Sequence, residues 1–252
     1  MSIKTKVSKV LKALLTKKQF PILLGIFLCM LVAGLWKALE NQEHYNRYKA
    51  VETEAQKIVA LVNIDLQSRI KSLERITNRW EIREGTPKDE FEKDALAYIV
   101  DSPGYQAIEW VDRTFHVRWI IPLKGNEAAQ NLNLAFENNR RIALENARDR
   151  KFPTLTSPID LIQGGKGFLV YHPIFVKEMF EGFVLAVFRT QKWLTHILQS
   201  KTSPKEKRKF LALISMDGKQ IYSHEHWDKK KEAEWAVTVE TYLYGHSFSI
   251  RC

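Results

Sequence analysis

Two short stretches carry residue types that could do chemistry, and each also has an ordinary structural interpretation. Residues 164–167 read Gly-Gly-Lys-Gly, a composition that can cradle a phosphate, but the spacing of a phosphate loop and its closing Lys-Ser/Thr pair are missing. We interpret them as a tight turn whose glycines supply positive φ angles. His224 and His226 flank Glu225 and could bind a metal ion from one side of a strand. No third ligand stands nearby in the sequence, so a surface loop is the simpler interpretation.

The sequence contains none of the common catalytic signatures. A Gly-x-Ser-x-Gly nucleophile elbow, the protein-kinase motifs and a paired-carboxylate motif are all missing. We therefore expect a binding protein that is not an enzyme, with no cofactor and no metal. Cys29 lies inside an apolar run and Cys252 is the last residue, so the two do not form a disulfide framework. A domain of this size needs no disulfide, which leaves an oxidising compartment open.

The residues best suited to binding lie in an aromatic segment, 105–127 (YQAIEWVDRTFHVRWIIPLKGNE). Two runs rich in Trp, Val and Ile, Gln106–Val111 and His116–Ile121, are separated by a polar-led connection, which predicts a β-hairpin. Pro122 removes a ladder donor and ends the second strand. Three residues of the hairpin are candidates for ligand contact: Trp110, Arg118 and Trp119. Packing in an ordinary core is the alternative for both tryptophans, since aromatic strand residues are usually buried.

The positive charge of the chain is concentrated at its N-terminus. The net charge is +10, from 39 basic and 29 acidic residues. Residues 1–37 hold seven lysines and no acidic residue, so the remaining chain has 32 basic against 29 acidic residues. A nearly balanced remainder offers no basic face, and we expect no nucleic-acid partner.

An apolar run near the N-terminus predicts a membrane anchor. Phe20 to Trp36 is a run of 17 uncharged residues between two lysines, the lower limit for spanning a ~30 Å hydrocarbon core. Lys37 can snorkel to extend it, and Trp36 suits the interface. A cleaved signal peptide is the alternative, but the run is long for one and no small-residue cleavage site follows. Six preceding lysines place residues 1–19 in the cytoplasm, the span (20–37) in the inner or plasma membrane, and residues 38–252 in the periplasm or outside the cell.

Residues 38–84 predict one long helix. They contain no proline or glycine, and ~45 residues at 1.5 Å each would extend ~65–70 Å. Apolar residues recur at nearly heptad spacing: Val51, Ala55, Ile58, Val62, Leu66, Ile70, Leu73, Ile76 and Trp80. The half nearest Trp80 is expected to lie on its own domain. For the membrane-proximal half, with nothing obvious to cover, we expect a parallel homodimer through Val51, Ala55, Ile58 and Val62.

The rest of the chain predicts an α+β fold in two units, 85–200 and 201–252, joined by a charged linker at 201–209. In the first unit we expect helices at Pro87–Val100, Asn138–Arg150 and Gln191–Gln199, the hairpin described above, and strands at Gly167–Val176 and Gly182–Arg189. In the second unit we expect two hairpins: Phe210–Ser215 with Lys219–Ser223, and Trp235–Tyr244 with His246–Arg251. The first unit fits a PAS-like sensor domain, although the order of elements alone would leave several folds open.

Several motifs, in order and spacing, resemble the CHASE domain, the extracytoplasmic sensor module of many bacterial and plant membrane receptors. They are 103–112 (PGYQAIEWVD), 118–123 (RWIIPL), 125–127 (GNE), 156–159 (TSPI), Leu161, 163–165 (QGG), 167–169 (GFL) and Pro173. The resemblance covers about residues 70–200. It implies a tandem PAS-like architecture, with a ligand pocket over the sheet of the membrane-distal unit and a membrane-proximal unit after it.

The resemblance also implies further site residues. In plant cytokinin-binding members the ligand is contacted from the position of Thr156, by the backbone near Ile162, and from a threonine where this chain has Tyr171. An aspartate of those members corresponds to Arg140 here. A cation in place of an acid disfavours an adenine-type ligand and favours an anionic one.

The expected function is therefore small-molecule sensing outside the cytoplasm. The signal would pass through a dimeric helix to a cytoplasmic output, a diguanylate cyclase or histidine kinase, reached through a second membrane span beyond these 252 residues. A membrane-anchored envelope interaction or scaffold protein without ligand-driven signalling is the alternative. An anchored hydrolase is a third class, but no motif supports it.

Overall fold

The computed structural model describes residues 20–162, 164–200, 211–227 and 236–252. Contacts divide the chain into two units, residues 1–50 and 51–252. The expected cytoplasmic tail (1–19) and the expected linker (201–209) lie outside the described residues, as do Phe210 and Trp235, the predicted first residues of two strands.

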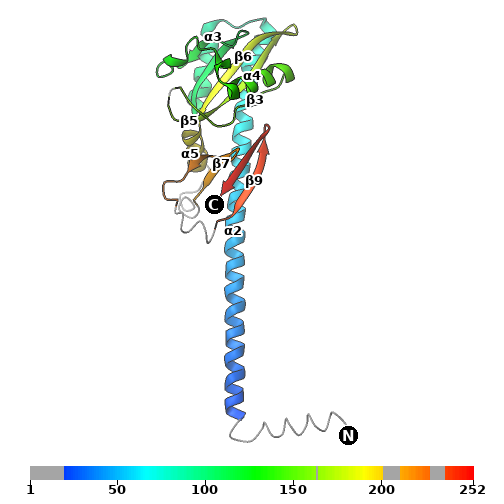
Figure 1. Ribbon diagram of the computed structural model, residues 1–252, viewed down its shortest axis with the longest axis vertical. Coiled ribbons are helices and arrows are strands. Elements are labelled where there is room, and N and C mark those ends of the chain that lie inside the picture. Colours follow the sequence, from blue (N-terminus) through cyan, green and yellow to red (C-terminus); the bar gives the residue numbers. More distant parts are fainter. Residues whose placement is uncertain (1–19, 163, 201–210, 228–235) are drawn as a thin grey trace, which may run out of the picture. The chain divides into compact units, whose positions relative to one another are not determined.

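The predicted span and the predicted long helix form one element, α2 (Phe20–Arg83), drawn in blue to cyan in Figure 1. Its first part is apolar and exposed, with a mean hydropathy of 2.3 over its most apolar 18-residue window. Among the described residues it is the one helix long and apolar enough to cross a membrane. The helix ends where predicted. Gly85 adopts a φ of +145° and donates its backbone N–H to the carbonyl of Trp80 at 2.9 Å, and Pro87 follows.

The first sheet of residues 51–252 is antiparallel and six-stranded, in the order β2-β1-β6-β5-β3, with β4 also paired to β5. Its elements follow one another as α3 (Lys88–Asp101), β1 (Tyr105–Asp112), β2 (Val117–Ile121), the 3-10 turns η1 (Glu127–Ala129) and η2 (Leu134–Phe136), α4 (Asn138–Arg150), β3 (Thr154–Leu155), β4 (Ile159–Asp160), β5 (Lys166–Val176), β6 (Met179–Arg189) and α5 (Thr190–Ser200). The predicted hairpin is confirmed, with Trp110 opposite Trp119. The predicted glycine turn is also confirmed, with Gly164 and Gly165 at φ angles of +81° and +82°.

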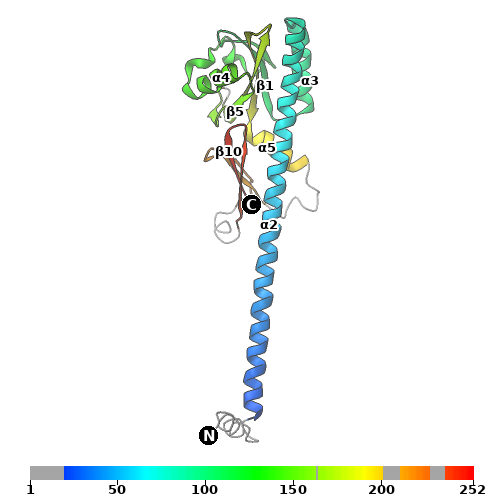
Figure 2. The same cartoon turned by 90° about the vertical axis from the view of Figure 1, so that its right-hand side faces the viewer.

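Alternating side chains give this sheet two differently covered faces, because successive residues of a strand point to opposite sides. Ile108, Val170 and Val184 belong to a core cluster that contains residues of α2, α3 and α5. Ala107, Leu169 and Leu185 belong to a second cluster that contains residues of α4. We call these the α2 face and the α4 face. Figure 2 shows α4 on one side of the sheet and α2 with α3 on the other.

The second sheet is four-stranded, in the order β8-β7-β10-β9. Its strands are β7 (Leu213–Met216), β8 (Lys219–Ser223), β9 (Thr238–Leu243) and β10 (His246–Arg251). They include both predicted hairpins. Residues 224–226 lie in a loop and turn after β8, and the described residues contain no group of three potential metal ligands.

The expected dimer seam is wrong for three of its four residues, while the fourth, Val51, is half-buried. Ala55, Ile58 and Val62 are buried within the chain itself, in the same core cluster as Ile214 and Phe248 of the second sheet. The sequence pattern correctly marked these positions as buried. The chain's own second sheet covers them, so they are not free to meet a second copy.

A buried charged network fastens α2 to the first sheet. Arg69 is 3% exposed. It pairs with Asp65 and donates to the backbone carbonyls of Ser102 (3.0 Å) and Pro103 (2.8 Å). Trp193 of α5 donates its indole N–H to the same Asp65 carboxylate at 2.7 Å. Arg69 therefore supplies hydrogen-bond donors to the carbonyl groups where α3 ends. Its partner Asp65 accepts from the indole of α5, so the network joins α2 to both helices.

Substituting Arg69 with methionine should destabilise the fold strongly. Arg69→Met leaves Asp65 without its cation and two carbonyls without donors, and we expect a loss of about 3 kcal/mol in the free energy of unfolding. The matched control is Arg75→Met, an exposed arginine of the same helix, which should change it by less than about 0.5 kcal/mol. Urea unfolding followed by tryptophan fluorescence measures both. Equal effects of the two substitutions would contradict a structural role for the network.

Candidate ligand-binding site

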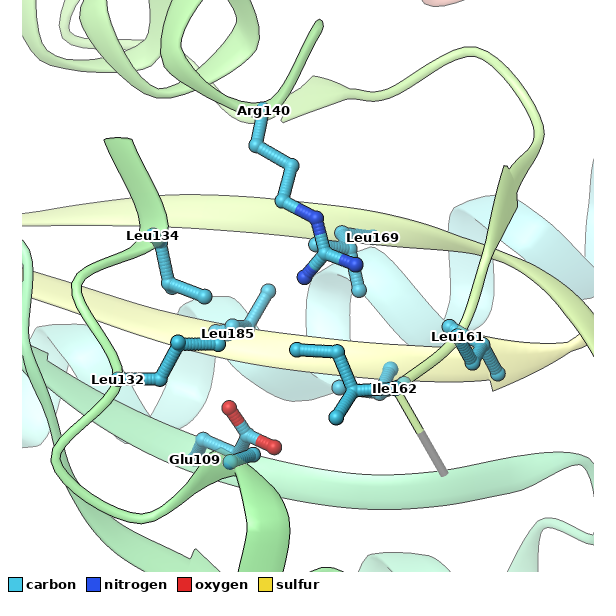
Figure 3. Close-up of a pocket in the computed structure, with 10 residues that line it drawn as sticks. Glu109, Leu132, Leu134, Arg140, Leu161, Ile162, Leu169 and Leu185 are labelled. Atoms are coloured by element: carbon cyan, nitrogen blue, oxygen red, sulfur yellow. The ribbon is translucent and has the colours of Figure 1, made fainter. Parts of the chain in front are cut away.

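A small cavity lies on the α4 face of the first sheet (Figure 3). Eight of its ten lining residues are apolar, and the other two are Glu109 and Arg140. Its volume is about 10 Å³, room for roughly one water molecule. An apolar enclosure with a few fixed polar groups has the composition of a small-molecule site.

Arg140 reaches the cavity from the first turn of α4. The residue is only 5% exposed. Its Nε donates to Glu137 at 3.0 Å and one terminal nitrogen donates to the carbonyl of Asp160 at 3.4 Å, while the guanidinium lies 5.3 Å from the ring centroid of Phe136. Arg140 therefore has a fixed orientation, and two of its five guanidinium donors are used among the described residues.

Glu109 reaches the cavity from β1 on the opposite side. It is 1% exposed, and its Oε1 has no hydrogen-bond partner among the described residues. Burial raises the pKa of this carboxyl to about 8, although the positive charge of Arg140 opposes the shift. Figure 3 shows the carboxylate and the guanidinium pointing toward one another across the cavity, and no ion pair joins them among the described residues.

Of the residues predicted from the sequence, Arg140 and Ile162 line this cavity. Tyr171 lies on the same face, fully buried, and its hydroxyl has no hydrogen-bond partner among the described residues. Burial raises the pKa of Tyr171, so the phenol is neutral. Thr156 is used elsewhere. Its hydroxyl accepts from the backbone N–H of Leu169 at 3.0 Å, and it lines a separate cleft of about 280 Å³ beside His246.

The hairpin candidates lie away from the cavity. Trp110 and Trp119 are on the α2 face, where their rings lie 5.2 and 5.7 Å from that of Trp80; this fits the core alternative. Arg118 is exposed and donates to Asp112 at 2.6 Å. Burial acts against ionisation of Asp112, but hydrogen bonds from neighbours that include Arg118 hold its pKa at about 2, below the usual range.

Sequence reasoning missed Glu109, although a signal was present. It is an acid in the middle of a mostly apolar strand, directly between Ile108 and Trp110. Alternation places it on the face opposite Trp110, so a core role for the tryptophan would have pointed to Glu109 as the residue facing the other layer.

A family model described as the CHASE domain matches residues 41–224, and the chain belongs to this family. No curated protein sequence matches it. Similar solved structures include the extracellular ligand binding receptor from Desulfohalobium retbaense DSM5692 (TM-score 0.62, 13% identity, covering 80% of this chain and 39% of that chain). This chain therefore spans well under half of that receptor chain.

Two further structures match along most of their length. The ligand-binding domain of the Pseudomonas aeruginosa amino acid chemoreceptor PctC, in complex with GABA, has a TM-score of 0.54 and 10% identity, covering 81% of this chain and 97% of that chain. The ligand-binding domain of the Pseudomonas fluorescens chemoreceptor CtaA, in complex with L-serine, has a TM-score of 0.57 and 14% identity, covering 82% and 97%. These likenesses confirm the predicted α+β, PAS-like sensor fold. Family and fold together support a sensor role in a membrane receptor.

The buried carboxyl of Glu109 should make stability depend on pH. Its folded pKa of about 8 lies above the ordinary value of 4.5. Between these values the native state holds a proton that the unfolded state has lost, so the free energy of unfolding falls as pH rises through this window. Glu109→Gln removes this dependence. Between pH 5 and pH 9 the free energy of unfolding of the variant should therefore rise relative to that of the wild type by a few kcal/mol.

Urea unfolding at pH 5, 7 and 9 measures this effect. The control is Glu92→Gln, which changes an exposed acid paired with Lys88 on α3. Its free energy of unfolding should depend on pH in the same way as that of the wild type. If the free energy of unfolding of Glu109→Gln also follows the pH dependence of the wild type, a raised pKa of Glu109 is contradicted.

Proposed function

We propose that this chain is the extracytoplasmic small-molecule sensor of a membrane signalling receptor, and that its ligand binds in the Arg140 cavity through an anionic group. The observation that carries the proposal is the guanidinium of Arg140, which is buried beside an apolar cavity and, among the described residues, bonds only to Glu137 and the carbonyl of Asp160. Burying a cation is unfavourable unless its donors find acceptors, and a carboxylate or phosphate accepts from arginine with two parallel bonds.

Ligand binding requires a wall of the cavity to move. A volume of about 10 Å³ is smaller than any organic anion, so binding must displace lining side chains. Ile162 is the simplest to displace because 40% of it is exposed, and rotamer changes of this kind are common on binding.

Known ligands of structurally similar proteins agree with an anionic group. PctC was solved with GABA and CtaA with L-serine, and both compounds carry a carboxylate. An adenine-type ligand, which offers N–H groups to an acid in cytokinin-binding CHASE members, would meet a donor at Arg140.

The segment from β3 to β4 offers a route for the signal. The carbonyl of Asp160 accepts from Arg140, while Ser157 donates to Asp217, in the turn between β7 and β8 of the second sheet, at 2.6 Å. His246 of the second sheet lies 3.1 Å from the carbonyl of Leu155. We propose that a ligand on Arg140 shifts this segment, and that the two sheets act as membrane-distal and membrane-proximal PAS-like units.

We further propose that the N-terminus is cytoplasmic, that residues 38–252 are extracytoplasmic, and that α2 forms a parallel homodimer through its exposed side. The output would be a cytoplasmic diguanylate cyclase or histidine kinase. Extracellular domains of chemoreceptors and histidine kinases among the similar structures support this kind of receptor. The gene sequence that follows codon 252 tests it, since a second apolar span and one of these domains should follow.

A thermal-shift screen tests the binding site. The whole chain in detergent micelles is screened against amino acids, other organic acids, nucleotides and purines. A true ligand at 100 times its dissociation constant should stabilise the protein by about 2.7 kcal/mol. Arg140→Met should abolish this gain, whereas Arg141→Met, an exposed neighbour bonded to Asn138, should retain it.

The negative outcomes of this screen are distinct. Binding by purines alone would contradict the role of Arg140 while leaving a sensor. Absence of any ligand in a broad screen would favour the alternative, an anchored envelope scaffold without ligand-driven signalling.

Cysteine cross-linking in intact cells tests topology and dimerisation together. Ile64 is 57% exposed on the side of α2 opposite Val62, which is fully buried. In a background with Cys29→Ser and Cys252→Ser, Ile64→Cys should react with a membrane-impermeant thiol reagent and form a disulfide-linked dimer. Val62→Cys should do neither. Labelling of Ile64→Cys only after lysis would contradict the topology, and labelling without cross-linking would contradict a dimer through this side of α2.

A further inference from the structure

We propose that the ligand held on Arg140 also carries a positively charged nitrogen that pairs with Glu109, and that its binding releases a proton from this carboxyl. The sensor would thus recognise a small zwitterion, with an acid and an amine at its two ends, and its sensitivity would rise with pH. This inference rests on the proposed function of the Arg140 cavity.

The position of Glu109 has no structural explanation within the sheet. Its neighbours across the two adjacent strands are Ile120 of β2 and Leu185 of β6, which offer no donor. Leucine or isoleucine would pack there without the penalty of burying an unpartnered acid. An acid that is 1% exposed, with a free oxygen in a cavity wall, has the properties of a group that awaits a ligand's donor.

Few other charges act on this carboxyl. Arg140 faces it from α4, and Glu137, at the start of that helix, is paired with Arg140 at 3.0 Å. Tyr171 on β5 is buried and neutral. The cavity's lining from β6 and from the segments 129–134 and 161–162 is apolar. Among the described residues, Arg140 is therefore the one cation that faces Glu109, and it makes no direct ion pair with it.

The two groups specify opposite ends of one ligand. Arg140 has N–H donors for an anion, and Glu109 across the cavity can accept from an ammonium group. A ligand with a carboxylate alone would bring a second negative group toward Glu109, and one with an amine alone would leave Arg140 unmatched. Only a molecule with both charges satisfies both walls of the cavity.

The exchange of protons follows from the state of Glu109 before binding. With a pKa raised to about 8 by burial, the carboxyl holds its proton at neutral pH. The ligand enters as the zwitterion, its ammonium N–H bonds to the carboxylate form, and the displaced proton leaves to solvent. One proton released per ligand means that affinity rises up to tenfold for each pH unit below about 8 and levels off above it.

Matched ligand pairs test the proposal on the whole chain by isothermal titration calorimetry. The probes are 4-aminobutyrate against butyrate and butylamine, and L-alanine against propionate. We expect at least one amino acid to bind more than tenfold tighter than its deaminated partner. Its dissociation constant should fall about tenfold from pH 6.5 to 7.5, and the binding heat should depend on the ionisation heat of the buffer because a proton is released.

Glu109→Gln should remove the pH dependence and the preference for the amino group, while Glu92→Gln should keep both. If the first variant fails to fold, the matched pairs and the buffer dependence on the wild type still decide the question. Equal binding of acid and amino acid, abolished by Arg140→Met, would overturn this inference and leave the proposed function standing. Failure of all probes, with no effect of Arg140→Met in the wider screen, would overturn both.

Discussion

Both sheets are built on one side of a single helix, and this shared packing fills one face of the first sheet and leaves the other to α4. The apolar stripe of α2 from Ala55 to Trp80 is buried along its whole length, first against the second sheet and then against the α2 face of the first. That face of the first sheet is thereby filled, by the Trp80–Trp110–Trp119 cluster among others. The cavity where we propose that a ligand binds lies on the other face, between the sheet and α4, and the orientation of β1 places Glu109 in its wall.

Glu109 and Arg140 make this face less stable than an apolar core would be. The protonated carboxyl of Glu109 is buried with no hydrogen-bond partner for Oε1 among the described residues, and the buried guanidinium of Arg140 is satisfied only in part, by Glu137 and the carbonyl of Asp160. Sites that bind ligands commonly retain such unfavourable groups because a ligand resolves them. In this chain a zwitterion would satisfy a guanidinium and a carboxylate at once. The free energy gained at the two walls would be available to displace Ile162 and the segment that connects it to the second sheet.

Sequence patterns predicted the positions of most helices and strands, but they said less about which elements pack against one another. The hairpin at Trp110 and Trp119, the helix at Asn138–Arg150 and the end of the long helix near Gly85 follow from local rules and are confirmed. The stripe at Ala55, Ile58 and Val62 was correctly predicted to be buried, but helical periodicity cannot say whether a second chain or the same chain does the burying. Alternation likewise separates Glu109 from Trp110 without saying which face holds a cavity. Arg140 and Ile162 came from the family resemblance, which carries three-dimensional information that spacing lacks.

The most direct test of the central claim is a crystal structure of the chain with a ligand found by screening. We predict that the anionic group lies within hydrogen-bond distance of the Arg140 guanidinium, that a ligand nitrogen lies beside the Glu109 carboxylate, and that Ile162 has moved outward. A ligand bound instead among the tryptophans of the α2 face, or in the cleft beside His246 with Arg140 and Glu109 unchanged, would contradict the assignment of this cavity as the sensory site.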